Sequence, residues 1–342
     1  MREVKSNKKN PLKKIFIKLC RFLGFEVIDQ SNFTIPTSNK SINESISVPG
    51  KSSVTLPLGK VEITRPVKSL DIILRTCMSV NMLTQSKKRI FEKGKEEYTK
   101  RTLISITKSV NHAKNIFKDT KFKIYIIDHN SEKNQINEMK AILKKSNISF
   151  EIINLELDKF FHQIKKINEE NKGVTENQKS NMSNIHQSLF LSKQKSEDLT
   201  YFVEDDYIHE TISLSEILYT YEKIASLTKQ ELIICPTDYP YLYTQSENTK
   251  IFLGENRHWR QIDQTLCTFL TSKKIVEKYW NELTNMCKFE HYPFEKPLHN
   301  IYKKELCISP VPSLAVHFTN INSVYGLSPN VDWKRLWEEN EN

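Results

Sequence analysis

Three adjacent acids, Glu204, Asp205 and Asp206, follow the apolar residues Phe202 and Val203 in the stretch FVEDDY. Adjacent carboxylates repel one another, and they gain nothing from burial unless positive charge lies beside them. Two or three oxygen donors at a strand end suit a hard cation such as Mg²⁺ or Mn²⁺, which takes substrate phosphates as further ligands. The structural alternative is that the acids precede a helix and stabilise its N-terminus.

Polar side chains also end two other apolar segments of the chain. The segment SLDIILRT ends in Arg75 and Thr76, and the segment FKIYIIDHNS carries Asp128 and Asn130 close to its end. In open α/β sheets, ligands bind beyond the carboxyl ends of the strands. We therefore expect these side chains to lie beside the three acids, at one edge of a sheet.

The elements that would position them alternate along the chain. Apolar segments predict strands at residues 69–76, 122–131, 149–156, 198–206 and 231–240. Helical patterns lie between or after them, at residues 87–117, 132–146, 160–195 and 213–228. This alternation predicts an α/β fold with a mixed, mostly parallel sheet flanked by helices. A further strand (TLCTFL) and helix (SKKIVEKYW) follow within residues 249–280.

Composition limits the class of protein and of partner. The 342 residues carry a net charge of +10, which favours an anionic partner or else reflects a solvated lysine surface. No motif of a nucleic-acid-binding fold occurs, so specific nucleic-acid binding is not expected. The six cysteines lack CxxC spacing, which favours reduced core residues in a cytoplasmic protein.

The N-terminal region differs in character from the rest. In LKKIFIKLCRFLGF (12–25), apolar residues recur at helical spacing and basic residues occupy the other face. Such a helix can bind the inner face of an anionic membrane, or dock on protein. We expect this helix at residues 1–28, a Ser- and Asn-rich linker at 29–60, and one domain at 61–342. No apolar run approaches the roughly 18–20 residues of a membrane span.

The ordered set of strand ends carries a resemblance to a known family. An apolar strand followed by an acidic triplet that ends in Asp resembles the DXD motif of GT-A glycosyltransferases, here Glu204-Asp205-Asp206. Residues 69–326 follow the order of that fold, and the chain resembles a sugar transferase of bacterial or phage type. Its nucleotide-binding half would be about 69–206 and its acceptor half about 207–330. The resemblance makes all three acids metal-ligand candidates. Because the first motif position is Glu204 instead of Asp, Asp206 ranks first, Asp205 second, through water or substrate, and Glu204 last.

The resemblance implies roles for the other polar residues. Arg75, Thr76, Asp128 and Asn130, with Asp205, would contact the nucleotide sugar. The segment PSLAVHF resembles the late part of the fold, where a His such as His317 binds the metal or the diphosphate. The implied cofactor is Mn²⁺ or Mg²⁺, and the implied partners are a nucleotide sugar and a saccharide or lipid-linked acceptor.

Two further sets of candidates lie in the later half of the chain. Arg257, Trp259 and Arg260 form a cluster in which arginine pairs with phosphate and Trp stacks on a sugar. The alternative for this cluster is an ordinary exposed loop. An inverting transferase needs a carboxylate base for the acceptor hydroxyl, and Asp263 and Asp238 are the candidates. A retaining enzyme would need no such base, and the sequence does not decide between the two outcomes.

Two other functions fit parts of this pattern. A nucleotidyltransferase also uses strand-end carboxylates with Mg²⁺, but it would show a Gly-rich phosphate loop, and RTCMSVN after the first strand has no glycine. A non-catalytic module for anionic glycan or nucleic acid would bind through net charge and lose affinity steeply with salt.

Overall fold

The computed structural model describes residues 11–25, 27, 61–78, 89–164, 173–244, 249–288, 295–319 and 323–341. Backbone contacts divide the chain into two units, Met1–Val61 and Glu62–Asn342. The predicted linker at residues 29–60 lies outside the described residues.

The first unit contains helix α1 (Pro11–Phe22). Its apolar side chains Ile15, Phe16, Leu19 and Phe22 are between 55% and 88% exposed. Lys18 is exposed too. None of the helices in the described part of the chain combines the length and the apolarity that a membrane crossing requires.

The second unit is built on a nine-stranded sheet with the order β3-β2-β1-β4-β9-β6-β10-β8-β7. The strand pairings show that β8 and β9 run opposite to the seven others, so the sheet is mixed and mostly parallel. Its strands are β1 (Ser69–Thr76), β2 (Lys121–Asp128), β3 (Ser149–Asn154), β4 (Leu199–Glu204), β6 (Leu232–Ile234), β7 (Ile251–Leu253), β8 (His258–Gln261), β9 (Phe269–Ser272) and β10 (Leu306–Val311). A second, small sheet pairs β5 (Tyr207–His209) with β11 (Ala315–His317).

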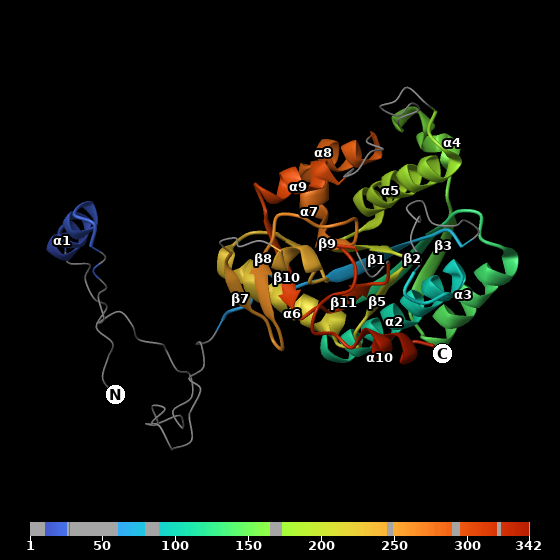
Figure 1. Ribbon diagram of the computed structural model, residues 1–342, viewed down its shortest axis with the longest axis horizontal. Helices are drawn as coiled ribbons and strands as arrows, with labels where there is room; N and C mark the ends of the chain where they lie inside the picture. The colour runs from blue at the N-terminus through green and yellow to red at the C-terminus, as the bar shows by residue number, and fades with distance from the viewer. Residues whose placement is uncertain are drawn as a thin grey trace, which may run out of the picture. The chain divides into compact units, whose positions relative to one another are not determined.

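Helices cover both faces of the large sheet (Figure 1). One layer contains α2 (Lys95–Ile116), α3 (Lys133–Lys145), α6 (Ser213–Thr228) and α10 (Trp333–Glu338). The other contains α4 (Leu157–Phe160), α5 (Glu176–Lys195), α7 (Lys273–Lys278), α8 (Trp280–Asn285) and α9 (Lys296–Tyr302), with the short 3-10 helices η2 (Phe161–Gln163) and η4 (Met286–Lys288). A third 3-10 helix, η3 (Pro240–Tyr243), follows β6.

The predicted α/β class, a mixed, mostly parallel sheet flanked by helices, is confirmed. Strand β1 and helix α6 occupy the predicted residues 69–76 and 213–228. The strand predicted at 231–240 ends at Ile234, and Pro236, which follows, has no N–H for a further ladder bond. Four of the six cysteines are buried, in agreement with their prediction as core residues: Cys235, Cys267, Cys287 and Cys307.

Two predicted helices begin later than expected. The helix predicted from residue 87 starts at Lys95, after Gly94 as N-cap. The helix predicted over 160–195 is interrupted, and α5 begins after Thr175, whose side chain accepts a hydrogen bond from the Gln178 N–H. Thr175 and Gln178 form a capping box, which explains why the long α5 starts there.

Candidate active site

The predicted strand ends meet at one edge of the sheet. Strand β1 lies between β2 and β4 and runs parallel to both, so the three carboxyl ends are adjacent. The register places Thr76 opposite Asp128 and Arg75 opposite Glu204. The sequence order of polar strand ends therefore becomes one cluster of side chains, as a parallel sheet requires.

Each acid of the triplet faces a different set of partners. Glu204 is the last residue of β4, and its Oε1 lies 2.9 Å from an Arg75 guanidinium nitrogen. Arg75 also donates a hydrogen bond to Asn181 Oδ1 of α5, at 3.2 Å. The hydroxyl of Thr268 contacts Glu204 Oε2 at 3.3 Å. Glu204 is therefore held on the α5 side of the sheet by an arginine that is only 7% exposed.

Asp205 points instead to the first turn of α2. Its Oδ2 lies 3.3 Å from Lys95 Nζ and accepts a hydrogen bond from the Thr99 hydroxyl at 3.1 Å. The backbone N–H of Cys77, just after β1, donates to the same oxygen at 3.4 Å. These contacts tie the end of β1 and the start of α2 to the acidic turn.

Asp206 faces His317, which the small sheet brings to it. Residue 317 of β11 pairs with Tyr207 of β5, and His317 Nε2 lies 3.4 Å from Asp206 Oδ2. The backbone N–H of Phe318 donates to the Asp206 carbonyl at 2.9 Å. Burial alone would raise the pKa of Asp206, but His317, Arg89 and Lys95 outweigh it and hold that pKa below its ordinary value.

The orientation of His317 is fixed from its other side. Its Nδ1 lies 2.7 Å from the carbonyl oxygen of Tyr325, and its ring stacks on Tyr207 with centroids 4.5 Å apart. A donated Nδ1–H places the remaining nitrogen, Nε2, toward Asp206, where it can hold a proton or a metal. Burial would lower the pKa of His317, but Asp206 and Glu204 raise it above the ordinary value.

Arg89 supplies a further positive charge at this edge. A guanidinium nitrogen lies 3.7 Å from Asp206 Oδ2, and the group sits 4.0 Å from the ring centroid of Tyr98. All three of its nitrogens are buried without a hydrogen-bond partner among the described residues. Buried guanidinium donors are costly to leave unpaired, so an anion is the expected ligand.

The protein's own cations thus offset the charge of the triplet. Arg75 faces Glu204, Lys95 faces Asp205, and Arg89 with His317 faces Asp206. Within the described residues no group of three or more His, Cys, Asp or Glu side chains could hold a metal by itself. The adjacent carboxylate and imidazole of Asp206 and His317 nevertheless fit a cation whose other ligands are substrate phosphates and water.

The end of β2 is organised by its own hydrogen bonds. Thr76 donates to Asp128 Oδ1 at 2.7 Å, and the hydroxyl and N–H of Ser131 also donate to the Asp128 carboxylate. Asn130 is exposed, and its φ of 57° makes it the left-handed residue of this turn. The turn is therefore preorganised at the position predicted for the nucleotide.

His129 has no role in the sequence-based prediction, and the structure gives it one. Its Nδ1 lies 2.8 Å from the hydroxyl of Ser180, at the N-terminal part of α5. This contact links the turn after β2 to α5.

The burial of Trp259 contradicts its predicted role in sugar stacking. Trp259 is fully buried in β8, and its indole N–H donates to Glu216 Oε1 at 3.2 Å. Its ring cannot stack on a sugar from this position. The two arginines of the same cluster have acidic partners, Glu210 for Arg257 and Asp238 for Arg260.

The two candidates for a general base differ in environment. Asp238 is 1% exposed, pairs with Arg260 and accepts a hydrogen bond from the Tyr243 hydroxyl. Burial raises the pKa of Asp238 although Tyr243 and Arg260 lower it, but a side chain that is 1% exposed is not accessible to an acceptor hydroxyl from solvent. Asp263 is exposed, and the next residue, Gln264, accepts a hydrogen bond from the hydroxyl of Tyr325, the residue that holds His317.

Sequence reasoning missed several residues of this cluster. Lys95 and Thr99 stand one helical turn apart at the start of α2, and that spacing was the available signal for a pair on one face. Arg89 lies in a segment without periodicity. Glu295, 4% exposed at the start of α9, also belongs to the surroundings: burial and then Glu204 raise its pKa to about 7.

Comparisons with known proteins give distant structural similarity only. No family model and no curated protein matches the sequence. Among solved structures, S. aureus TarS aligns at 10% identity and a TM-score of 0.34, over 62% of this chain and 29% of TarS. The galactosyltransferase LgtC, in complex with donor and acceptor sugar analogues, aligns at 11% identity and a TM-score of 0.35, over 68% of this chain and 70% of LgtC.

The similar structures include another class of enzyme. The UTP-bound UGPase from Acinetobacter baumannii aligns at 9% identity and a TM-score of 0.39, over 80% of this chain and 92% of that one. The first of these structures, TarS, is spanned over less than a third of its length. Similarity at this level does not assign a reaction.

Proposed function

We propose that this protein is a metal-dependent glycosyltransferase. It would move a sugar from a nucleoside diphosphate sugar to a hydroxyl of a saccharide or lipid-linked acceptor. The observation that carries the proposal is the group formed by Asp206, His317 and Arg89 at the carboxyl edge of the sheet. A carboxylate, an imidazole and a guanidinium whose N–H groups have no hydrogen-bond partner among the described residues are complementary to a diphosphate bound with a divalent cation.

The roles in this proposal divide among the strand ends. Asp206 and His317 would hold Mn²⁺ or Mg²⁺, which when bound neutralises charge on the leaving diphosphate. Arg89 and Lys95 would pair with phosphate oxygens. Asn130 and the turn held by Asp128 would border the nucleoside.

The acceptor side would depend on Asp263. In an inverting reaction its carboxylate removes the proton of the acceptor hydroxyl, and that oxygen bonds to the anomeric carbon as the bond to the diphosphate breaks. Its exposure leaves it free to meet an acceptor that binds from solvent. In a retaining reaction Asp263→Asn would keep its rate, so this variant separates the two outcomes.

The test is binding and turnover of nucleotide sugars with and without Mn²⁺. A nucleotide sugar with the correct base should raise the melting temperature of the protein only when the metal is present. When an acceptor is added, nucleoside diphosphate should be released. Asp206→Asn should abolish both responses, whereas Asp119→Asn, at an exposed acid on the turn before β2, should leave them unchanged. Release of pyrophosphate from a nucleoside triphosphate would indicate a nucleotidyltransferase instead.

We also propose that α1 binds an anionic membrane surface, as a peripheral attachment of a cytoplasmic enzyme. An exposed apolar face with Lys18 beside it matches helices that lie in the interfacial region. The protein should co-sediment with vesicles containing phosphatidylserine, and Phe16→Asp with Leu19→Asp should prevent it. Equal binding by this double variant would exclude α1 as the attachment.

A further inference from the structure

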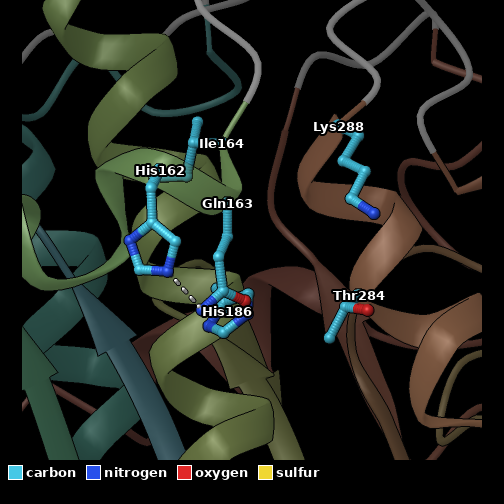
Figure 2. Close-up of a pocket in the computed structure, with 6 residues that line it drawn as sticks. All are labelled: His162, Gln163, Ile164, His186, Thr284 and Lys288. Carbon is cyan, nitrogen blue, oxygen red and sulfur yellow. Dashed lines mark hydrogen bonds between the residues drawn. The ribbon is translucent and has the colours of Figure 1, made fainter.

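A cavity of about 530 Å³ lies on the α5 side of the sheet. Its described lining residues include none of the side chains at the carboxyl ends of β1, β2 and β4 that form the candidate active site, which we call the strand-end cluster. Figure 2 shows its walls: η2 and the residue after it on one side, α5 at the base, and α8 with η4 opposite. The lining residues are His162, Gln163, Ile164, His186, Thr284 and Lys288. Its volume falls within the range of small-molecule sites, about 300–1,000 Å³.

His186 is the feature of this cavity that calls for a ligand. Its side chain is 1% exposed, and neither ring nitrogen has a hydrogen-bond partner among the described residues. The ring lies 4.7 Å from that of Phe160 and 6.0 Å from that of Trp280, between centroids, so apolar neighbours fix it in place. Buried polar groups in proteins are almost always paired, so both nitrogens point to a partner that the described residues do not supply.

The protonation state of His186 determines which hydrogen-bond donors and acceptors the partner needs. Burial, with His162 and Lys288 nearby, lowers its pKa to about 4, so the ring is neutral near pH 7. A neutral imidazole has one N–H donor and one lone pair. A hydroxyl group, which both accepts and donates, satisfies either nitrogen.

Among the remaining lining residues, Lys288 adds positive charge and Thr284 adds an acceptor. Lys288 of η4 and His162 of η2 come from opposite walls, and no acid is among the described residues that line the cavity (Figure 2). The Thr284 hydroxyl already donates to the Trp280 carbonyl at 2.8 Å, so its lone pairs are what it can offer to a ligand. The cavity therefore combines a site for negative charge with sites for hydroxyl groups.

We propose that this cavity binds a small polyhydroxylated anion, a sugar that carries a phosphate or a carboxylate group. The anionic group pairs with Lys288. Sugar hydroxyls bond to His186 and to the Thr284 oxygen. The site is separate from the proposed donor site, and it holds whether or not the strand-end cluster is catalytic.

The test is a titration of the full-length protein followed by NMR of the histidine ring protons. Glucose 6-phosphate and glucuronate are the two anionic probes, and they distinguish phosphate from carboxylate as the charged group. Glucose and inorganic phosphate are the matched compounds that each lack one half of the ligand. We expect saturable shifts of the His186 resonance with at least one anionic sugar, at lower concentration than with glucose or phosphate alone.

Variants locate the binding and separate it from the strand-end cluster. Lys288→Gln, at an exposed position that folding tolerates, should weaken binding roughly tenfold, the usual loss for a charged hydrogen bond. His186→Phe should weaken it as well, while Lys303→Gln and Asp206→Asn should leave it unchanged. The proposal is overturned if no probe gives a saturable shift, if Lys288→Gln binds like the parent, or if Asp206→Asn abolishes binding.

Discussion

At the strand-end cluster, burial and charge compensation act on the same few side chains. Glu204 and Asp206 are adjacent to Asp205, yet each faces a cation from a different element. The three acids lie at the end of a strand and in the turn after it, where consecutive side chains point in different directions. Each acid can therefore meet a different cation. Adjacent residues therefore need not bind the same metal ion. The predicted metal ligands divide into Asp206 with His317, Asp205 beside Lys95, and Glu204 beside Arg75.

Glu295 shows what burial does to an acid without a compensating cation of its own. One of its carboxylate oxygens, Oε2, is buried without a hydrogen-bond partner among the described residues, and the pKa is raised from 4.5 to about 7. A raised folded-state pKa means that the protonated acid stabilises the fold below pH 4.5. That stability is lost as the pH rises through 7.

We therefore predict that Glu295→Gln removes part of the pH dependence of folding. Between pH 5 and pH 8 the free energy of unfolding of the parent should fall relative to this variant by roughly 2–3 kcal/mol. Urea unfolding at the two pH values measures the difference. Glu277→Gln, at an exposed acid of α7, is the control and should follow the parent. Parallel pH profiles for parent and Glu295→Gln would show that Glu295 does not titrate in this range.

At the scale of the elements, Arg65 in the segment before β1 forms ion pairs that join several of them. Arg65 pairs with Asp198 at the start of β4, at 2.5 Å, and with Glu231 at the start of β6, at 3.1 Å. Tyr221 of α6 donates to the same Glu231 carboxylate at 2.6 Å. These contacts connect β4, β6 and α6 at the amino-terminal edge of the sheet, opposite the candidate active site.

Arg65→Met should destabilise the second unit by about 2 kcal/mol, because the largely buried Asp198 carboxylate loses its cation and, among the described residues, Glu231 keeps only the exposed Lys274. Burial raises and Arg65 lowers the pKa of Glu231, with a net value of about 2. A lowered folded-state pKa stabilises the fold above pH 4.5, and this contribution is lost as the pH falls toward 2. The deficit of Arg65→Met should shrink over that interval in urea unfolding. A deficit that stays constant with pH would assign the loss to packing.

The hairpin β7–β8 depends on a close approach to α6. A Cβ at Gly254 would lie 2.2 Å from Glu216 Oε1 and 2.5 Å from Trp259 Nε1, both fully buried. Gly254→Ala should therefore cost about 2 kcal/mol or more of unfolding free energy, measured by thermal or urea unfolding. Gly173→Ala is the matched control, because no atom of the described residues beyond its chain neighbours lies within 4 Å of its Cβ position. Equal stability of both variants would mean that Glu216 moves aside without cost.

These same elements show what the sequence could and could not predict. Apolar segments with polar ends predicted β1, β2 and β4 and their meeting at one edge, because the parallel arrangement follows from the alternation with helices. Sequence periodicity could not predict that β9 inserts antiparallel between β4 and β6. Nor could it predict the burial of Trp259, since that depends on Glu216, a carboxylate 43 positions away that accepts its N–H.

At the scale of the whole molecule, the boundary between the two units falls after Val61. Residues 64–68, just after it, are hydrogen-bonded to the rest of the second unit. The backbone N–H groups of Thr64 and Arg65 both donate to the Ser226 hydroxyl, and that of Val67 donates to Glu222. Lys68 N–H donates to Asp198 at 2.8 Å. The second unit therefore begins with a segment that is bonded to α6 and β4.

Removal of residues 1–61 should leave the second unit folded with an unchanged melting temperature, because the contacts of residues 64–68 lie after the cut. The truncated protein should also keep the metal-dependent response to a nucleotide sugar and lose binding to anionic vesicles. As a control, removal of residues 1–68 takes away Arg65 and its ion pairs and should lower the melting temperature. If the two truncations melted alike and below the full chain, the first unit would contribute to the stability of the second.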